Sequence, residues 1–292
     1  MAASIFPQAQ GAAGPAFPPA EPPSRPPNLE YERQASAQTV QTPAGTDRGD
    51  AIPPPPRAPF RPSYMANPHS RARRENPGPE VIASRVAAGV SANYRGNYRL
   101  ARNRPANIPQ EENCSVYITG LSPTITTHQL LAAIHNTGRV WASVISPPTR
   151  EHGMAAAKIT FFTSVAAQIF LARANGPGQP GFFVDGIRAV VRPDRNRVAE
   201  APEPEDHTRC LSIAGPVDIV TVPNLMAHFS RDFVFEVDEI VPLVMGQSIN
   251  ILEWRFGSYR CQAQWAWRNL RENPFFQSRG VRVQFENDPC DL

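Results

Sequence analysis

Tyr117 is the residue best suited to contact a ligand, because it is an aromatic side chain in a stretch where apolar and polar residues alternate. Residues 116–121 alternate apolar side chains with polar or aromatic ones. Alternation at period two places Val116 and Ile118 on one face of a strand and Tyr117 and Thr119 on the other. One face would pack into a core, and the other would present a ring on which a nucleobase could stack.

Basic residues supply the second kind of chemistry. The chain holds 28 arginines and one lysine, Lys158. Arginine suits planar, bidentate contact with phosphate, although a GC-rich genome would also favour arginine codons. The net charge is +4 over residues 1–112 and +5 over 113–197, but −4 over 198–208 and −2 over 209–292. This distribution predicts an anion-binding first half and a second half with another role.

The elements that would position these side chains occupy about 85 residues. After the first strand, Thr126 or Thr127 can cap a helix that ends near Gly138. Strands over 139–146 and 154–161, a helix over 163–174 and a last strand over 187–192 follow. The order βαββαβ is that of the split-βαβ group of α+β folds.

Residues 113–197 resemble an RNA-recognition motif. Residues 116–121 match its hexapeptide well, whereas 154–161 match its octapeptide poorly. Ala156 and Lys158 stand where the family has stacking aromatics. The resemblance implies a ferredoxin-like, four-stranded antiparallel sheet in the order 4-1-3-2, whose open face binds single-stranded RNA.

Alternation mapped onto that strand order gives the candidate RNA-binding residues. They are Tyr117, Thr119, Trp141, Lys158, Thr160, Arg188 and Arg192, with Arg195 and Arg197 beyond the last strand. The position of Trp141 assumes that Val140 and Val144 face inward, which turns Ser143 and Ile145 outward. Two alternatives stay open: Trp141 could be buried against the linker or the second domain, and Lys158 could be a solvated surface residue.

A divergent second copy is predicted over residues 209–290, after a stiff acidic linker at 198–208. Ser212 stands where Tyr117 stands in the first copy. The third strand of this copy would run over 249–263, with Gly257 marking a bulge and Ser258, Arg260 and Gln262 outward. Trp254, Phe256, Trp265 and Trp267 are expected in the core or an interface. The layout of both copies resembles that of a group of fungal proteins with tandem motifs.

Residues 1–111 form a tail rich in proline and arginine, which we predict to be disordered. Residues 53–61 fit a proline-groove ligand, a pattern that also arises by chance. The end of the tail could add RNA contacts, or serve only as a solvated linker. The candidates are Tyr94, Arg95, Tyr98, Arg99, Arg102 and Arg104.

Several function classes lack support in the sequence. The four cysteines are widely spaced, so no zinc site is expected, and no catalytic pattern or cofactor motif is legible. No secretory signal or membrane-spanning run is apparent, which favours an intracellular protein, nuclear or cytoplasmic. The sequence therefore predicts a non-enzymatic RNA-binding protein. The alternative is a protein-interaction scaffold built from two such domains that no longer bind RNA, with partners held by the proline-rich tail or the second domain.

Overall fold

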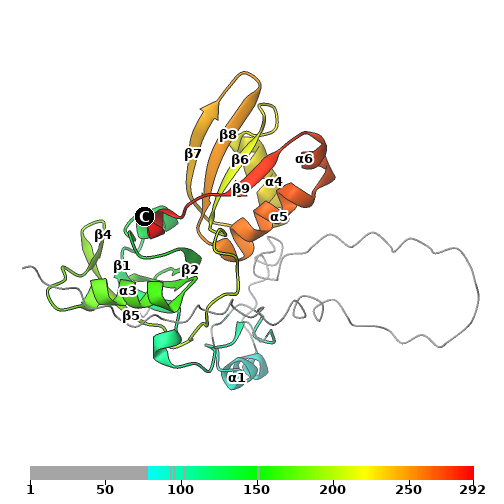
Figure 1. The fold of residues 1–292 in the computed structure, drawn as a ribbon. Helices are drawn as coiled ribbons and strands as arrows, with labels where there is room; N and C mark the ends of the chain where they lie inside the picture. Colours follow the sequence, from blue (N-terminus) through cyan, green and yellow to red (C-terminus); the bar gives the residue numbers. More distant parts are fainter. Residues whose placement is uncertain (1–77, 93, 95–96, 101–102, 150–151) are drawn as a thin grey trace, which may run out of the picture. The chain divides into compact units, whose positions relative to one another are not determined.

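The computed structural model describes residues 78–92, 94, 97–100, 103–149 and 152–292 of the chain. All of them fall within one unit, Ala58–Leu292. The disorder predicted for residues 1–77, and the proline-groove motif at 53–61, lie outside the described residues. Two modules with the expected βαββαβ order follow one another within this unit (Figure 1).

The first module contains five strands and two helices. In chain order they are β1 (Ser115–Leu121), α2 (Thr127–Leu131), β2 (Val140–Ser146), β3 (Ala155–Phe161), α3 (Ser164–Asn175), β4 (Phe182–Val184) and β5 (Ile187–Pro193). The antiparallel sheet has the order β2-β3-β1-β5-β4. Leaving aside β4, this is the predicted 4-1-3-2 arrangement.

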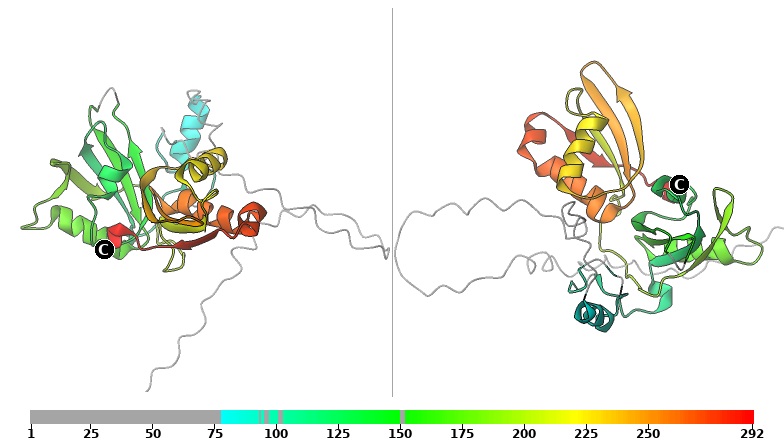
Figure 2. Two further views of the ribbon diagram at one scale, coloured as in Figure 1. Left: turned by 90° about the horizontal axis from the view of Figure 1, so that it is seen from above. Right: turned by 180° about the vertical axis from the view of Figure 1, so that it is seen from behind.

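Local sequence explains where the two helices begin. Thr126 caps α2 through a capping box with Gln129, and Thr163 caps α3 by accepting a hydrogen bond from the Ala166 amide. Both helices bury their apolar side chains in the same core as the inward residues of the strands. The opposite face of the sheet is therefore covered by neither α2 nor α3. Figure 2 shows the sheet and these helices from two further sides.

The fifth strand comes from a tight hairpin that the sequence analysis did not identify. Asp185 and Gly186 link β4 to β5, and their φ angles are +48° and +77°. Positive φ at both central residues is the conformation of a type I′ hairpin turn, which favours an Asp-Gly pair. The hairpin adds β4 beside β5 and widens the sheet.

The second module repeats the arrangement. It contains β6 (Cys210–Pro216), α4 (Val222–Asp232), β7 (Val237–Met245), β8 (Ile249–Phe256), the π turn η4 (Tyr259–Ala263), α5 (Gln264–Glu272), α6 (Pro274–Ser278) and β9 (Arg282–Phe285). Its sheet has the order β7-β8-β6-β9. Trp254 and Phe256 are buried, and Trp265 and Trp267 pack on the same core, as predicted.

The prediction for the third strand of this module was wrong beyond Phe256. The strand β8 ends at Phe256, and a Cβ atom at the next residue, Gly257, would lie only 3.1 Å from the Glu236 side chain and 3.0 Å from that of Thr127. The chain then enters η4 instead of a bulge. Ser258, predicted to point outward, is buried, and Cys261, predicted to point inward, is exposed, whereas Tyr259 and Ala263 are buried as predicted.

Described parts of the predicted tail contact the folded modules. Residues 78–111 include the helix α1 (Pro79–Ala87), and the short 3-10 helix η3 (Gln110–Glu112) lies before β1. The Ala106 amide donates to the carbonyl of Arg197, and the Cys114 amide donates to that of Val198. Disorder was therefore the wrong prediction for the described part of residues 78–111, where a helix forms and Ala106 pairs with the chain after β5.

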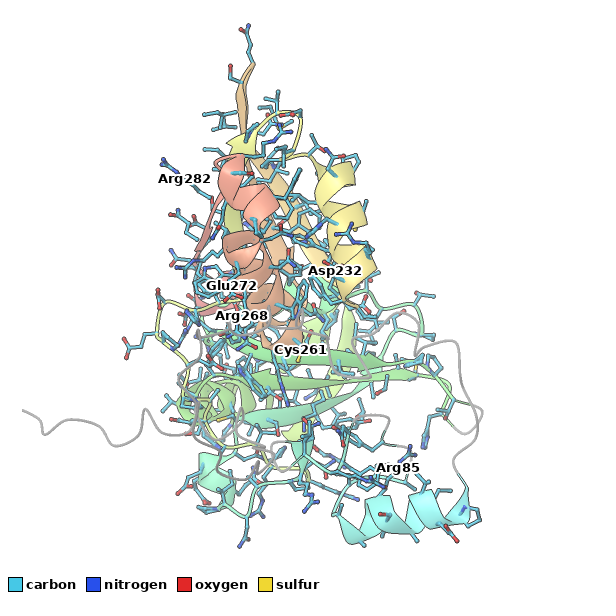
Figure 3. All side chains as sticks on the ribbon, turned by 90° about the vertical axis from the view of Figure 1, so that its right-hand side faces the viewer. Arg85, Asp232, Cys261, Arg268, Glu272 and Arg282 are labelled. Atoms are coloured by element: carbon cyan, nitrogen blue, oxygen red, sulfur yellow. The ribbon has the colours of Figure 1, made fainter. Side chains whose placement is uncertain are left out.

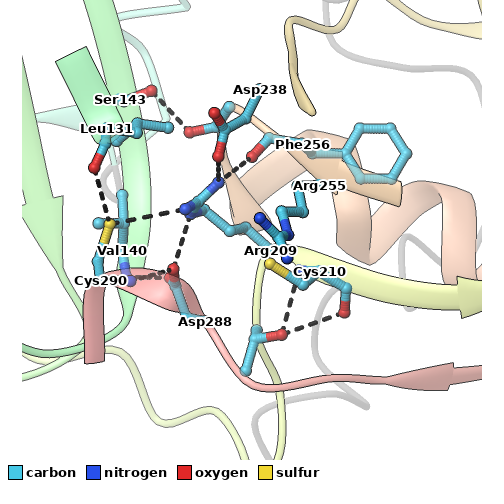
Figure 4. Close-up of polar contacts among 12 residues, drawn as sticks. Leu131, Val140, Ser143, Arg209, Cys210, Asp238, Arg255, Phe256, Asp288 and Cys290 are labelled. Atoms are coloured by element: carbon cyan, nitrogen blue, oxygen red, sulfur yellow. Dashed lines mark hydrogen bonds and ion pairs between the residues drawn. The ribbon is translucent and has the colours of Figure 1, made fainter. Parts of the chain in front are cut away.

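A buried arginine joins the two modules (Figure 4). Arg209, only 1% exposed, donates to Asp288 at 3.0 Å and to Asp238 at 2.6 Å. The second oxygen of Asp288 accepts from the Val140 amide of the first module at 2.8 Å, and Cys290 is buried in the core of that module. Burial lowers the pKa of Arg209, but the carboxylates outweigh it and hold that pKa well above its ordinary value. The C-terminal segment that follows the second module thus contributes Cys290 to the core of the first module.

Candidate nucleic-acid interface on the first sheet

Tyr117 lies at the centre of the open face of the first sheet. It pairs in register with Lys158 on β3 and with Arg192 on β5. Its side chain is 38% exposed, whereas Val116 and Ile118 are fully buried. Thr119, two residues on, is half-buried between Ala156 and Val190. The predicted outward positions of β1 and β5 are therefore correct.

The arginines of β5 and of the chain beyond it differ in availability. Arg188, Arg192 and Arg195 are exposed, and in the described part of the chain none of them forms an ion pair. Arg197 is half-buried and donates to the carbonyl of Ile108. It therefore holds the segment before β1 and is less available than predicted.

Lys158 is on the predicted face, but its charge is already paired. Its ammonium lies 2.5 Å from the Asp194 carboxylate and donates to the carbonyl of Asn196 at 3.1 Å. Asp194 is buried. A phosphate would have to compete with these partners, so Lys158 is neither the free phosphate contact nor the merely solvated residue that the sequence suggested.

Thr160 was wrongly predicted to be accessible. It pairs with Ser115, and the two residues are 2% and 1% exposed. The Ser115 hydroxyl is bound to the side chain of Asn113 and to the carbonyl of Asn196. Residues 194–198, named here the 194–198 segment, thus close this end of the sheet face.

The predicted register of β2 was also wrong beyond its first residue. A bulge lies between Val140, which pairs with Phe161, and Ala142, which pairs with Thr160. One extra residue reverses the faces that follow, so Val144 pairs with Lys158 and is 58% exposed. Ile145 packs against the core instead, and Ser143 is also moved off the open face.

Trp141, the residue at the bulge, follows the alternative that the sequence left open. It packs against the core of the second module, and the guanidinium of Arg260 lies 4.6 Å from the centre of its ring. Ser143 donates its amide to Ser258 and its hydroxyl to the carbonyl of Gly257. The free edge of β2 is thus occupied by the second module, and Trp141 does not lie on the open face of the first sheet.

An exposed aromatic residue on β4 was missed. Phe183 is 44% exposed and pairs with Arg188, whereas Phe182 and Val184 on either side of it are buried. Alternation over these three residues, followed by Asp185-Gly186, was the signal that could have revealed it.

Some of the candidate RNA contacts in the tail, among them Tyr94, Tyr98 and Arg104, are already engaged within the protein. Tyr94 is half-buried, and burial raises its pKa. Hydrogen bonds with Ser84 and Arg99 lower the pKa of Tyr98, and Arg104 donates to the Tyr98 carbonyl at 2.9 Å. Arg95 and Arg102 lie outside the described residues.

The equivalent face of the second module has a different character. Ser212, at the position of Tyr117, pairs with Glu253 and Gln284 and is only 7% exposed. Arg255 binds Glu253 at 2.6 Å and also binds Glu239. Internal ion pairs thus replace the exposed ring and the free arginines of the first module.

Neither a metal centre nor a disulfide is found among the described residues. They include no cluster of histidine, cysteine or acidic residues that could hold a metal ion. All four cysteines are free thiols, and burial raises the pKa of Cys114 to about 12.

Two βαββαβ modules, one with an exposed aromatic between basic residues, together define a tandem arrangement of the RNA-recognition-motif fold.

No protein-family model and no curated protein matches the sequence. Among solved structures, RNA recognition domains 1 and 2 of Sex-lethal from Drosophila melanogaster are 18% identical and cover 60% of this chain and 100% of their own, with a TM-score of 0.22. The first two RRM domains of the yeast poly(U)-binding protein Pub1 are 15% identical, covering 59% and 99%, with a TM-score of 0.24. The three N-terminal RNA-binding domains of the yeast splicing factor Prp24 are 10% identical, covering 59% and 64%, with a TM-score of 0.27.

Proposed function

We propose that the protein binds single-stranded RNA on the open face of its first module and catalyses no reaction. The observation that supports this most directly is the exposed ring of Tyr117, held in register beside Arg192 on the sheet face opposite α2 and α3. A base stacks on a tyrosine ring through its π face, which every base possesses.

Phosphate contacts supply the second part of the binding. Arg192 is an exposed cation directly opposite that ring, and Arg188 and Arg195 are exposed cations further along β5 and just beyond it. Contacts with phosphate position a strand but carry no sequence information. The protein therefore binds RNA with slight base preference and with an affinity that falls as salt rises. The folded Arg99 and Arg104 add to the positive field.

Substitution of Tyr117 tests this function. Base stacking on an aromatic side chain contributes about 1–3 kcal/mol, so Tyr117→Ala weakens binding of a mixed-sequence RNA oligomer roughly tenfold. Tyr117→Phe keeps the ring and retains binding. Fluorescence anisotropy with the intact protein measures both, and equal affinity of the Ala variant and the wild type removes Tyr117 from the site.

A protein-interaction scaffold is the second candidate, and one observation favours it. The end of the β7–β8 hairpin exposes Leu243, Val244, Met245 and Ile249. The sequence between Glu239 and Glu253 contains no charged residue. An uncharged, apolar strand edge is typical of a protein contact. Absence of RNA binding by the intact protein at every salt concentration supports this candidate instead.

We also propose where in the cell the protein is located. Free thiols at all four cysteines fit an intracellular protein, in the nucleus or the cytoplasm. Among the described residues, no helix has the length and apolar character needed to cross a membrane.

A further inference from the structure

Phe183 gives the first sheet a second exposed ring, on the strand that the Asp185–Gly186 turn adds. It shares a face with Arg188, because directly paired residues of an antiparallel ladder point to the same side. Arg188, Val190 and Arg192 alternate along β5, and Arg192 pairs with Tyr117. Phe183 and Tyr117 therefore lie on the same open face, on either side of β5.

The distance between the two rings decides how they could share a ligand. Two strand spacings of about 4.8 Å and four residues of about 3.4 Å along β5 place the two residues roughly 17 Å apart. One base cannot touch both rings. Two different bases of one strand could stack on them, with the backbone of the RNA crossing β5 between them.

The arginines of β5 lie along that crossing. Arg188 and Arg192 are exposed, and within the described residues neither is paired with a carboxylate. The Arg188 guanidinium lies against Gly181, where a Cβ atom would be 3.0 Å from its Nε. Gly181, at φ +94°, thus leaves room for Arg188 to lie beside the start of β4.

The half of the open face formed by β3 and β2 has fewer exposed groups that could stack on a base or bind a phosphate. The Lys158 charge is paired with Asp194, and Thr160 is buried at the end that the 194–198 segment closes. Trp141 packs against the second module. Exposed groups able to stack or to bind phosphate are thus concentrated on β1, β5 and β4.

We propose that the RNA strand crosses β1, β5 and β4, with one base stacked on Tyr117 and another on Phe183. Arg188 and Arg192 hold the phosphates between the two stacked bases. The inference rests on the proposed function and specifies the path of the ligand.

Substitutions of Phe183 test the path in the intact chain, by anisotropy of a labelled single-stranded RNA dodecamer of mixed sequence. Phe183→Leu keeps an apolar side chain but removes the ring, and it weakens binding about fivefold or more. Phe183→Tyr retains binding. Val144→Ala is the matched control: Val144 is also exposed and apolar on this face, but lies on β2. It leaves the affinity unchanged.

Combining Phe183→Leu with Tyr117→Ala separates the path from the function. Because the two rings hold separate bases, the fold-losses multiply. If only Tyr117→Ala weakens binding, the path is wrong and the proposed function stands. If Val144→Ala weakens binding as much as Phe183→Leu, the strand crosses the whole sheet and the path is also wrong. Absence of wild-type binding overturns the function, and the path with it.

Discussion

The ammonium of Lys158 lies 2.5 Å from the carboxylate of Asp194, which follows the last strand of the same sheet. The pair sits beside Tyr117, in the middle of the face that would bind RNA. Asp194 is buried, and its other carboxylate oxygen accepts from the Asn196 amide. The protein thus neutralises one of its own cations at the candidate site.

Removing that carboxylate charge should therefore strengthen RNA binding. Asp194→Asn keeps the shape of the side chain but frees Lys158 for a phosphate, so we expect affinity to rise a few-fold at low salt. Lys158→Gln alone should change affinity little, because its charge is already paired. Anisotropy titrations of the two single variants and the double variant measure this. A loss of affinity in Lys158→Gln as large as that in Tyr117→Ala would show that Lys158 already contacts RNA.

The contact between Arg209 and Asp288 predicts that the modules unfold together. Asp288→Ala leaves a buried guanidinium short of one partner and the Val140 amide without its acceptor. Breaking a buried pair in this way costs about 3–5 kcal/mol. Urea unfolding followed by tryptophan fluorescence should show a lower midpoint and a single transition.

Asp291→Ala is the control for this variant, because Asp291 is exposed in the same terminal segment. It should leave the midpoint unchanged. Two separate transitions in the wild-type protein would contradict the coupling. The same coupling makes isolated modules poor reagents, since a fragment that ends near residue 197 lacks Cys290, which belongs to the first core.

His207, in the linker between the modules, gives the stability a pH dependence. Its ring packs 4.3 Å from that of Phe285, and its Nδ1 lies 2.8 Å from the Tyr259 hydroxyl. Burial lowers the pKa of His207, against the opposite effects of Asp206 and Glu203. The nearby Arg139 also lowers it.

A histidine whose pKa is lowered by folding is held neutral in the folded state. Its contribution to stability is present above the unfolded pKa of about 6.5 and is lost as the pH falls through the lower folded value. Thermal unfolding of the wild type should therefore show a falling Tm below about pH 6.5. His207→Gln, which does not titrate, should give a flatter profile over that range. Identical profiles would show that other groups set the dependence.

The fold was largely predictable because its signals are local and periodic. Alternation around Tyr117 and on β5 gave the correct faces, and the capping threonine gave the start of α2. The repeated order of elements likewise revealed the second module. These features depend on neighbouring residues, which a single sequence displays directly.

The predictions that were wrong concern features that the local sequence pattern does not reveal. One extra residue at Trp141 reversed the faces of β2, and alternation contains no sign of where such a bulge falls. The pairing of Lys158 with Asp194 joins residues on different segments. The bond between Arg209 and Asp288 spans almost the whole second module. Such partners become visible only when the chain is folded.

The last prediction concerns the salt dependence of RNA affinity, because its slope increases with the number of phosphates that the protein contacts. If Arg188, Arg192 and Arg195 each contact one phosphate of single-stranded RNA, together they contribute a slope of about −2 in log K against log salt, from ~0.7 per contact. Arg192→Gln should flatten the slope of the intact protein by about 0.7. Asp194→Asn should steepen it by a similar amount, since Lys158 becomes a further contact.

Arg268→Gln is the control for these slopes. Arg268 is also an exposed arginine, but it lies on α5 of the second module, one turn before Glu272 (Figure 3). It is therefore not a residue of the first sheet, and its removal should leave the slope unchanged. Equal flattening by Arg268→Gln and Arg192→Gln would mean that binding follows the overall charge and no particular face. A slope near zero in the wild type would remove phosphate contact altogether and leave stacking on the two rings as the source of affinity.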